Sequence, residues 1–217
     1  MNLFKEQLRL YAVTDRAWTK EQTLYEQVKA ALSGGVTMVQ LREKEESRQE
    51  RYEEAKRLLA LCRSYQVPLL INDDVELARC IDADGVHVGQ KDMPAIKARA
   101  LLGKNKIIGV SAKTVEQARA AKEAGADYLG VGAAFATGTK RDASVISHTQ
   151  YRAIKEAVGL PMVAIGGITR DNINALRNTG VDGVALVSAI FAAEHIENAC
   201  RELRGVVDGW FVEEDEV

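Results

Sequence analysis

The sequence has few of the residues on which several protein classes depend. It contains three cysteines in 217 residues, far apart and without a CxxC pair, so neither a zinc site nor a disulfide framework is expected. Lys and Arg total 29 against 31 for Asp and Glu, which excludes a generally basic surface for nucleic acid or lipid headgroups. No run approaches the roughly 18 apolar residues of a membrane-spanning helix. Any anionic ligand must therefore be bound by a local group of cations.

We do not expect a signal peptide at the start of this sequence. The segment Met1–Arg9 is polar and charged, without the apolar core of a signal peptide. We expect a cytoplasmic protein, because a reducing compartment suits its cysteine content. We expect Cys62, Cys80 and Cys200 to be buried or half-buried helix residues.

Short β-branched, apolar runs alternate with longer helical patterns along the whole chain. No Pro/Gly/Ser-rich linker interrupts them, so we expect one domain over residues 1–217, with a solvated acidic tail at 212–217. Strands are predicted at 8–15, 37–43, 68–73, 85–89, 106–112, 128–134, 161–167 and 183–190. Helices are predicted at 23–33, 47–65, 75–81, 94–102, 114–125, 149–158, 172–178 and 194–207, the fifth beginning with a Thr114–Gln117 capping box.

Strict alternation of eight strands and eight helices predicts an α/β fold with a parallel sheet. The strands are mostly continuous apolar runs, which is typical of strands covered on both faces. Right-handed crossovers allow an open doubly wound sheet or a closed barrel. The count of eight and the short chain favour a single (β/α)8 TIM barrel. In such barrels the chemistry lies at the carboxyl ends of the strands, so polar residues there are the candidates for a site.

The strand predicted at 37–43 ends in a row of polar residues. Gln40, Arg42 and Lys44 occupy alternate positions, so period-two geometry places their side chains on one face. A solvated strand end is the simpler interpretation. We favour the other, in which these side chains point into a barrel mouth and create a positive potential for an anion.

Two carboxylates follow the next two strands. Asp73 comes directly after Asn72 at one strand end, and Asp92 lies with Gln90 in the loop after the following strand. Either carboxylate could simply cap the next helix. Together, beside Arg42, they suggest a magnesium–phosphate site, because Mg²⁺ is usually bound by one or two carboxylates plus phosphate oxygens.

Hydroxyl groups and glycines follow the later strands. Ser111 ends one strand and can form a hydrogen bond in the mouth. The loop 135–147 contains Thr, Gly and Lys residues that can surround a phosphate, although the spacing of a P-loop is missing. The seventh predicted strand ends in Gly166 and Gly167 and the eighth in Ser188, and the loops after these strands frequently bind phosphate in barrels of this type.

Histidine is scarce, with three residues in the chain. His87 lies inside a predicted strand, where we expect a hydrogen-bonded core or orienting residue. His148 and His195 are expected on helix surfaces. No Ser/His/Asp arrangement, zinc cluster or Rossmann glycine fingerprint is present.

In this order the segments resemble the thiamine phosphate synthase family. The likeness extends from Tyr11 to Phe191, and it is specific only as a set. The segments that carry it are VQLREK at 39–44, IND at 71–73, ADGVHVGQKDMP at 83–94, IIGVSAKT at 107–114, FATGTKRDA at 135–143 and VAIGGI at 163–168.

The resemblance implies a homodimeric, Mg²⁺-dependent enzyme that joins 4-amino-2-methyl-5-hydroxymethylpyrimidine diphosphate to thiazole phosphate, giving thiamine phosphate and pyrophosphate. The residues it implies for the pyrimidine diphosphate are Gln40, Arg42, Lys44, Asn72, Ser111 and Lys140. Those it implies for the thiazole phosphate are Thr137, Thr139, Gly167, Val187 and Ser188. Asp73 and Asp92 are implied as magnesium ligands, and Arg42, Lys44, Ser111 and Lys140 as catalytic residues.

A few positions depart from the family pattern. Ala133 and Ala136 replace prolines that are common there, and Lys113 replaces a common histidine. Two other functions stay open: a thiazole tautomerase on the same barrel, and a non-catalytic barrel that binds a phosphate ligand. Neither requires Asp73 and Asp92, so the presence of both carboxylates favours the synthase. A phosphate-binding barrel of the tryptophan-biosynthesis kind would need an acid–base pair that the sequence lacks.

Overall fold

The computed structural model describes residues 3–19, 22–43, 47–136 and 145–212. Eight parallel strands form a closed barrel in chain order, with β8 paired back to β1. This confirms the predicted (β/α)8 barrel. The strands are β1 (Leu10–Val13), β2 (Met38–Leu41), β3 (Leu69–Asn72), β4 (Gly85–Val88), β5 (Ile107–Ala112), β6 (Tyr128–Gly132), β7 (Met162–Ile165) and β8 (Gly183–Leu186).

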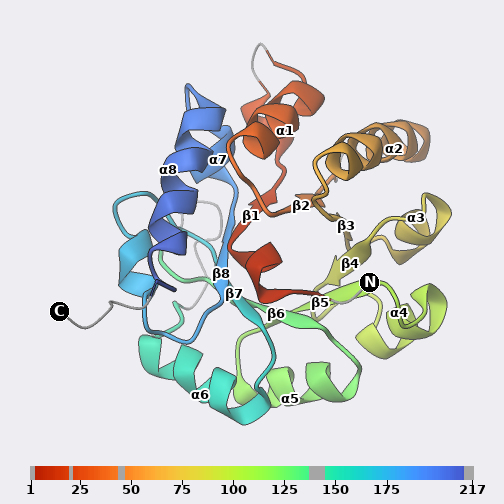
Figure 1. Cartoon of the computed structure of the whole chain (residues 1–217). Helices are drawn as coiled ribbons and strands as arrows, with labels where there is room; N and C mark the ends of the chain where they lie inside the picture. The colour runs from red at the N-terminus through yellow and green to blue at the C-terminus, as the bar shows by residue number, and fades with distance from the viewer. Residues whose placement is uncertain (1–2, 20–21, 44–46, 137–144, 213–217) are drawn as a thin grey trace.

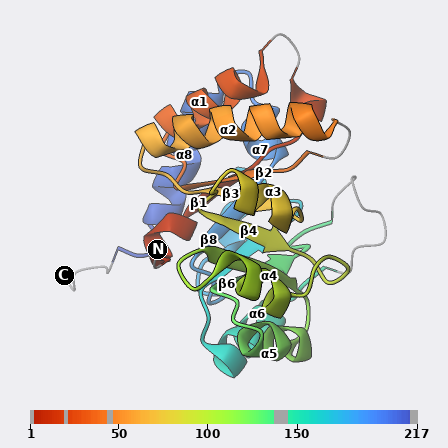
Figure 2. The same ribbon diagram turned by 90° about the vertical axis from the view of Figure 1, so that its right-hand side faces the viewer.

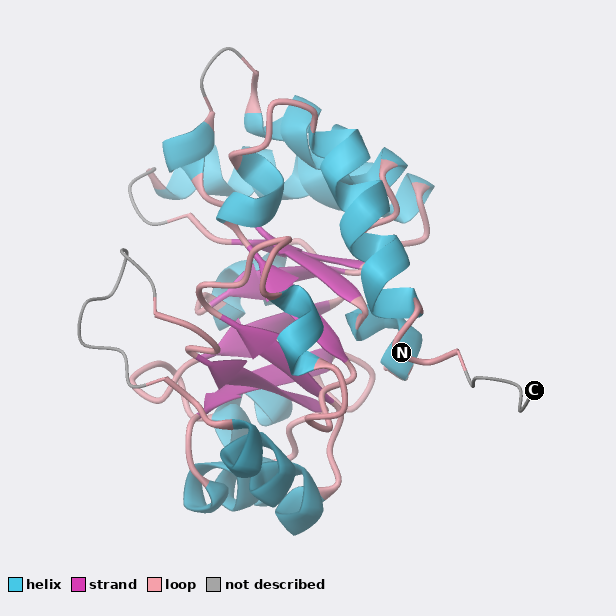
Figure 3. Cartoon of the chain, turned by 90° about the vertical axis from the view of Figure 1, so that its left-hand side faces the viewer, coloured by secondary structure: helices cyan, strands magenta, loops and turns pink. Residues whose placement is uncertain are grey.

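Helices surround the barrel as an outer layer (Figure 1, Figure 3). The α-helices are α1 (Leu24–Ser33), α2 (Arg48–Ser64), α3 (Val75–Cys80), α4 (Ala95–Leu102), α5 (Val115–Glu123), α6 (His148–Val158), α7 (Ser188–Phe191) and α8 (Ile196–Asp208). The 3-10 helices are η1 (Lys5–Leu8), η2 (Arg16–Trp18) and η3 (Ile173–Leu176). Helix α1 packs between α2 and α8, so the first and last helices are neighbours (Figure 2).

Local sequence signals explain where several helices begin. Helix α1 starts with a capping box, in which the Thr23 hydroxyl accepts the N–H of Glu26 and the Glu26 carboxylate accepts the N–H of Thr23. The capping box expected at Thr114 forms only by half. The Thr114 hydroxyl accepts the N–H of Gln117, but the Gln117 side chain accepts the N–H of Lys113 instead.

Three details of the prediction are wrong. The helix expected at 172–178 is the single 3-10 turn η3, because its short segment packs only Ile173 and Leu176 into the core. The strand expected at 183–190 ends at Leu186, and the apolar run continues as helix α7. Cys80 is exposed, whereas Cys62 and Cys200 are buried as expected, because Cys80 ends the short helix α3 on its outer side.

The side chains of the strands pack into two separate cores. Val39 and Leu41 point outward into the large core between the strands and helices, as the alternation predicts. A smaller core fills the barrel interior and includes Leu8 of η1, the short red helix near the centre of Figure 1. The interior core contains Leu8, Tyr11, Val13, Met38, Leu70, Ile107, Tyr128, Val163 and Ala185.

The four odd-numbered strands begin with the same side-chain contact. The residue directly before each even-numbered strand accepts a backbone N–H from the start of the preceding strand, which satisfies a donor that the barrel ladder leaves open. The four bonds are Leu10 N–H to Thr37 (2.9 Å), Leu69 N–H to Asp84 (2.9 Å), Ile108 N–H to Asp127 (2.7 Å) and Met162 N–H to Asp182 (2.9 Å).

Within the part of the chain that the structure describes, no helix has both the length and the apolar character needed to span a membrane. The acidic tail predicted at 212–217 lies outside the described residues except for Val212, which is exposed.

Candidate active site

The carboxyl ends of the parallel strands form one edge of the barrel, and the predicted site residues gather there. They come from the ends of β2, β3, β5, β7 and β8 and from the loop after β4. The described members of this set are Gln40, Arg42, Asn72, Asp73, Asp92, Ser111, Gly167, Val187 and Ser188. Lys44, Thr137, Thr139 and Lys140 lie outside the described residues.

The end of β2 places a buried amide and a half-exposed cation. Gln40 is 4% exposed, and its amide nitrogen donates a hydrogen bond to the Tyr11 hydroxyl (2.7 Å). The backbone N–H of Arg42 donates to the Thr14 hydroxyl (2.9 Å), and its guanidinium lies 3.9 Å from the Asp15 carboxylate. An ion pair this long and this exposed is weak. Arg42 can therefore exchange Asp15 for an anionic ligand at little cost.

The end of β3 presents Asn72 and Asp73, both half-buried. Asp73 does not cap the following helix, because the Asp74 carboxylate does so by accepting the N–H of Leu77 (2.9 Å). The backbone of Asp73 is left-handed, with φ of 64°, a conformation that is uncommon outside glycine and clusters at functional sites. Its N–H donates to the carbonyl of His87 (2.8 Å), which ties this corner to β4.

Asp92 is held by its own loop. Its Oδ2 atom accepts the N–H of Gly89 (2.7 Å). The N-cap of α4 is Pro94, which has no side-chain hydrogen bond to the helix, so Asp92 is not a helix cap either. Its Oδ1 atom makes no hydrogen bond within the described ranges, which leaves a carboxylate oxygen for a ligand.

The chemistry of Asp73 and Asp92 fits a Mg²⁺ ion. They extend from the adjacent strands β3 and β4 at the same edge of the barrel, and their carboxylate oxygens are the hard ligands that Mg²⁺ prefers. Among the described residues, no group of three or more His, Cys, Asp or Glu side chains could hold a metal alone. The pair therefore fits a cation that takes its other ligands from water and phosphate.

A chain of hydrogen bonds crosses the barrel interior. Beyond the bond from Gln40, the hydroxyls of Tyr11 and Tyr128 are 2.9 Å apart, and the Tyr128 hydroxyl is 2.8 Å from His87 Nδ1. The other ring nitrogen of His87, Nε2, is 2.9 Å from the Ser111 hydroxyl. These hydrogen bonds join Gln40 on β2 to Ser111 on β5 through Tyr11, Tyr128 and His87.

Burial keeps this chain uncharged. It lowers the pKa of His87 to about 4, against a smaller opposing effect of Asp92. It also raises the pKa values of Tyr11 and Tyr128 above their usual range. At neutral pH His87 is therefore a neutral, hydrogen-bonded core residue, as its place in the strand predicts.

Gly166 and Gly167 allow the end of β7 to approach the loop after β6. Both have left-handed backbones, with φ of 98° and 68°. A Cβ atom on Gly167 would lie 2.6 Å from the carbonyl oxygen of Phe135. A close backbone contact therefore requires glycine here, in addition to any approach to an anion. The contact positions the chain directly before residues 137–144, where three predicted ligand-binding residues lie.

The mouth end of β8 differs from the prediction. Ser188 is not a strand residue but the first residue of the one-turn helix α7, with Val187 as its N-cap. Ser188 is exposed and Val187 is half-buried. Both residues still follow the carboxyl end of β8, so the change of element leaves them at the mouth.

Sequence reasoning missed Tyr11, Tyr128 and Thr14, which shape the site from below. In the sequence they are members of apolar strands and resemble ordinary core residues. One signal could have found Tyr128. Gly130 lies on the same face of β6 as Tyr128, and Gly109 on the neighbouring strand β5 is the register partner of Tyr128. Glycines at inward positions indicate room for a large ring.

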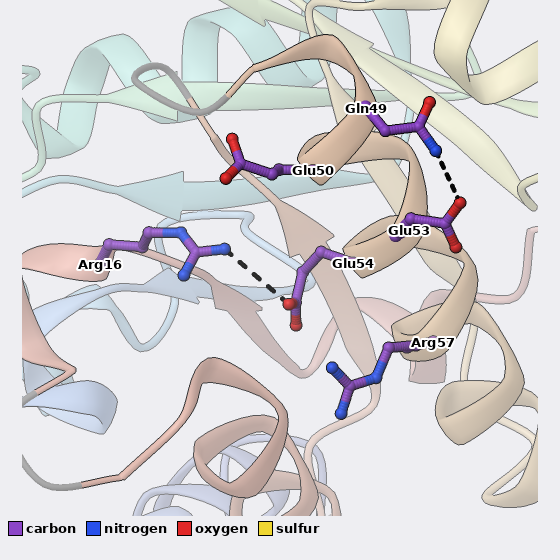
Figure 4. A pocket seen from close by; sticks show the side chains of 6 residues that line it. All are labelled: Arg16, Gln49, Glu50, Glu53, Glu54 and Arg57. Carbon is purple, nitrogen blue, oxygen red and sulfur yellow. Dashed lines mark hydrogen bonds and ion pairs between the residues drawn. The ribbon is translucent and has the colours of Figure 1, made fainter.

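A hollow of about 350 Å³ lies between η2 and α2, outside the barrel (Figure 4). Its lining is charged and internally paired: Arg16 lies 3.9 Å from Glu54, and the Gln49 amide donates to Glu53 (2.9 Å). None of the predicted site residues lines it. The candidate site therefore remains the barrel mouth.

A parallel barrel whose carboxylates, cation and hydroxyls meet at the strand ends is the architecture of a (β/α)8-barrel enzyme. The family model described as thiamine monophosphate synthase matches residues 10–190. The chain belongs to this family and is an enzyme of the transferase class.

Individual relatives agree with this assignment. The chain is 50% identical to a thiamine-phosphate synthase of Clostridium acetobutylicum, with 92% of this chain and 94% of the relative covered. It is also 50% identical to one from Alkaliphilus oremlandii, with 91% and 95% covered. Its fold matches a solved thiamine phosphate pyrophosphorylase from Pyrococcus furiosus with a TM-score of 0.88 and 41% identity, covering 96% of this chain and 99% of that chain.

Proposed function

We propose that this transferase joins the pyrimidine diphosphate to thiazole phosphate and releases thiamine phosphate and pyrophosphate. Family membership supports the reaction. The observation that carries it is the order of charges on three consecutive strands, with Arg42 after β2, Asp73 after β3 and Asp92 after β4. This order suits a diphosphate neutralised by a cationic side chain and a metal ion.

The reaction can proceed by loss of the leaving group first. The exocyclic CH₂–O bond of the pyrimidine breaks, and its electron pair leaves with pyrophosphate. The aminopyrimidine ring delocalises the positive charge that remains. The lone pair of the thiazole nitrogen then forms the new C–N bond. That nitrogen carries no proton, so no general base is required.

The protein must stabilise the charge that develops on pyrophosphate. We assign this role to Arg42, Lys44 and Lys140 as preorganised cations. Mg²⁺ held by Asp73 and Asp92 would neutralise part of the diphosphate charge when it is bound. Gln40, Asn72 and Ser111 orient the pyrimidine half. The residues assigned to the thiazole phosphate are Thr137, Thr139, Gly167, Val187 and Ser188.

We also propose a cellular location and an oligomeric state. Cys62, Cys80 and Cys200 are all free thiols, which supports a reducing cytoplasm. The resemblance supports a homodimer, and light scattering of the purified protein at several concentrations tests it.

The decisive experiment mixes the purified protein with both substrates, with Mg²⁺ or with a chelator, and measures thiamine phosphate. We expect product only with Mg²⁺. A folded protein that binds thiazole phosphate but forms no product with Mg²⁺ would overturn the assignment. It would favour a tautomerase or a ligand-binding barrel instead, which can be distinguished by adding the thiazole carboxylate phosphate alone.

A further inference from the structure

The hydrogen-bond chain in the barrel interior has a direction that its donors impose. The Gln40 amide nitrogen can only donate, so the Tyr11 oxygen accepts from it (2.7 Å). The single hydroxyl hydrogen of Tyr11 then points to the Tyr128 oxygen (2.9 Å), its one acceptor among the described residues. Tyr128 in turn has one hydrogen, and its remaining partner is His87 Nδ1 (2.8 Å).

This direction fixes the tautomer of His87. Because Nδ1 accepts from Tyr128, the imidazole carries its proton on Nε2, which donates to the Ser111 hydroxyl (2.9 Å). A ring that donates from Nδ1 would leave one of the two tyrosine hydroxyl hydrogens without an acceptor among the described residues. Proton counting alone therefore selects the neutral Nε2–H form.

The last member of the chain is left with one hydrogen to donate. The Ser111 oxygen accepts from His87, and its own hydrogen has no acceptor within the described residues. Ser111 is half-buried at the mouth end of β5, whereas Tyr11 and Tyr128 are buried. The hydroxyl hydrogen is thus available to a ligand in the mouth.

We propose that Tyr11, Tyr128 and His87 are positioning residues that transmit the donor direction of Gln40 to Ser111, so that Ser111 donates to an acceptor atom on the pyrimidine half of the substrate. The identity of that half rests on the proposed function. The direction of the chain and the His87 tautomer do not.

Glycines on β5 and β6 leave space in the barrel interior for the rings of Tyr128 and His87. A Cβ on Gly109 of β5 would overlap the hydroxyl end of Tyr128, and a Cβ on Gly130 of β6 would lie 2.9 Å from His87 Cε1. Gly109 is the register partner of both His87 and Tyr128, and Gly130 lies two residues after Tyr128 on β6, as the register partner of Ser111. Their arrangement supports a dedicated polar chain, since an ordinary barrel interior would be filled by branched apolar side chains.

The tautomer can be measured without any substrate. The chain has three histidines, so the ¹⁵N-histidine spectrum of the full-length protein is simple, and the signals missing in His87→Asn assign His87. Long-range ¹H–¹⁵N correlations at neutral pH should show protonated Nε2 and unprotonated Nδ1. A His87 ring protonated on Nδ1 would overturn the proposal, because the chain would then run from Ser111 toward Gln40.

Breaking the chain in the middle tests its effect on binding. Tyr128→Phe removes one buried hydroxyl, and Tyr151→Phe is the matched control, because Tyr151 is also 0% exposed but donates to the Val131 carbonyl (3.0 Å) outside the barrel interior. We expect Tyr128→Phe to abolish the single His87 tautomer and to raise KM for the pyrimidine diphosphate about three- to tenfold, the range of one net hydrogen bond. KM for thiazole phosphate should stay constant.

The outcomes separate the two proposals. Equal effects of Tyr128→Phe and Tyr151→Phe on the pyrimidine KM would overturn the positioning role. Absence of thiamine phosphate synthesis in the wild type would overturn the proposed reaction, while the tautomer measurement would still decide the direction of the chain.

Discussion

Arg42 and Asp92, for which we propose roles in binding the diphosphate and its metal ion, are held in two different ways. Arg42 is held loosely: its side chain is 32% exposed, and its guanidinium lies 3.9 Å from the Asp15 carboxylate. Asp92 is held firmly through one carboxylate oxygen, which accepts the N–H of Gly89. The first arrangement allows the Arg42 guanidinium to exchange Asp15 for another anion. The second fixes the orientation of the Asp92 carboxylate. Each arrangement makes a different substitution informative.

Replacing Arg42 with Ala should lower kcat/KM for coupling roughly 30- to 1000-fold. This corresponds to a loss of about 2–4 kcal/mol of transition-state stabilisation, as for other preorganised groups that stabilise developing charge. Its partner Asp15 stays solvated, so we expect little change in the unfolding midpoint. Arg201→Ala is the control, because Arg201 is an exposed arginine paired with Glu197 on α8. Steady-state rates within a fewfold of wild type would show that Arg42 does not face the diphosphate.

For Asp92, the informative change is to Asn. An asparagine oxygen can still accept the Gly89 N–H, so the loop should keep its conformation while the charge is lost. We expect Mg²⁺-dependent coupling to disappear, with thiazole phosphate binding by calorimetry unchanged, because in the proposed reaction the metal ion would bind only the diphosphate half. Near-normal turnover with Mg²⁺ would contradict the metal-ligand assignment.

At the scale of secondary-structure elements, the starts of the strands matter as much as their ends. Asp84 lies directly before β4, and its only side-chain hydrogen bond in the described part of the chain accepts the N–H of Leu69 at the start of β3. Leu69 is fully buried, so this N–H has no access to water. The same contact recurs before β2, β6 and β8, which indicates a general device for beginning strands in this barrel.

Asp84→Ala should therefore lower the free energy of unfolding by about 1–3 kcal/mol, the cost of an unsatisfied buried donor. Asp84→Asn keeps an acceptor oxygen and should lose less. Urea unfolding of both variants beside the wild type measures the difference. If the two variants are equally destabilised, the charge of Asp84 rather than its acceptor atom is what stabilises the strand.

The elements themselves were predictable to a large extent. Continuous apolar runs indicated all eight strands, and capping residues and glycines indicated helix ends, because each of these signals is local. Element ends were less certain where an apolar run crosses a boundary, as at Ser188. The interior chain could not be predicted, since Tyr11 and Tyr128 are 117 residues apart in sequence and only barrel closure brings them together. Gln40 and Ser111 were found because they end strands, but their connection was not.

On the scale of the whole molecule, the polar chain makes the centre of the barrel sensitive to pH. A histidine inside an apolar core resists protonation, and its pKa falls from 6.5 to about 4 in the folded protein. The unfolded chain exposes the same ring to water. The two states therefore bind different numbers of protons in the interval between these values, and folding stability must change there.

The sign follows from the depressed pKa of a basic group. Above about pH 6.5 the ring is neutral in both states and contributes no pH dependence. As the pH falls toward 4, the unfolded chain binds a proton that the folded protein does not bind, so the free energy of unfolding declines by about 3 kcal/mol for a shift of this size.

In His87→Asn this contribution should be missing, although carboxylates elsewhere still titrate. Urea unfolding of wild type and variant from pH 4 to 8, without Mg²⁺, measures the difference in slope. Parallel curves would mean that His87 is solvated enough to protonate in place. In that case the barrel interior would be open to water, and Ser111 could not depend on a dry chain of donors beneath it.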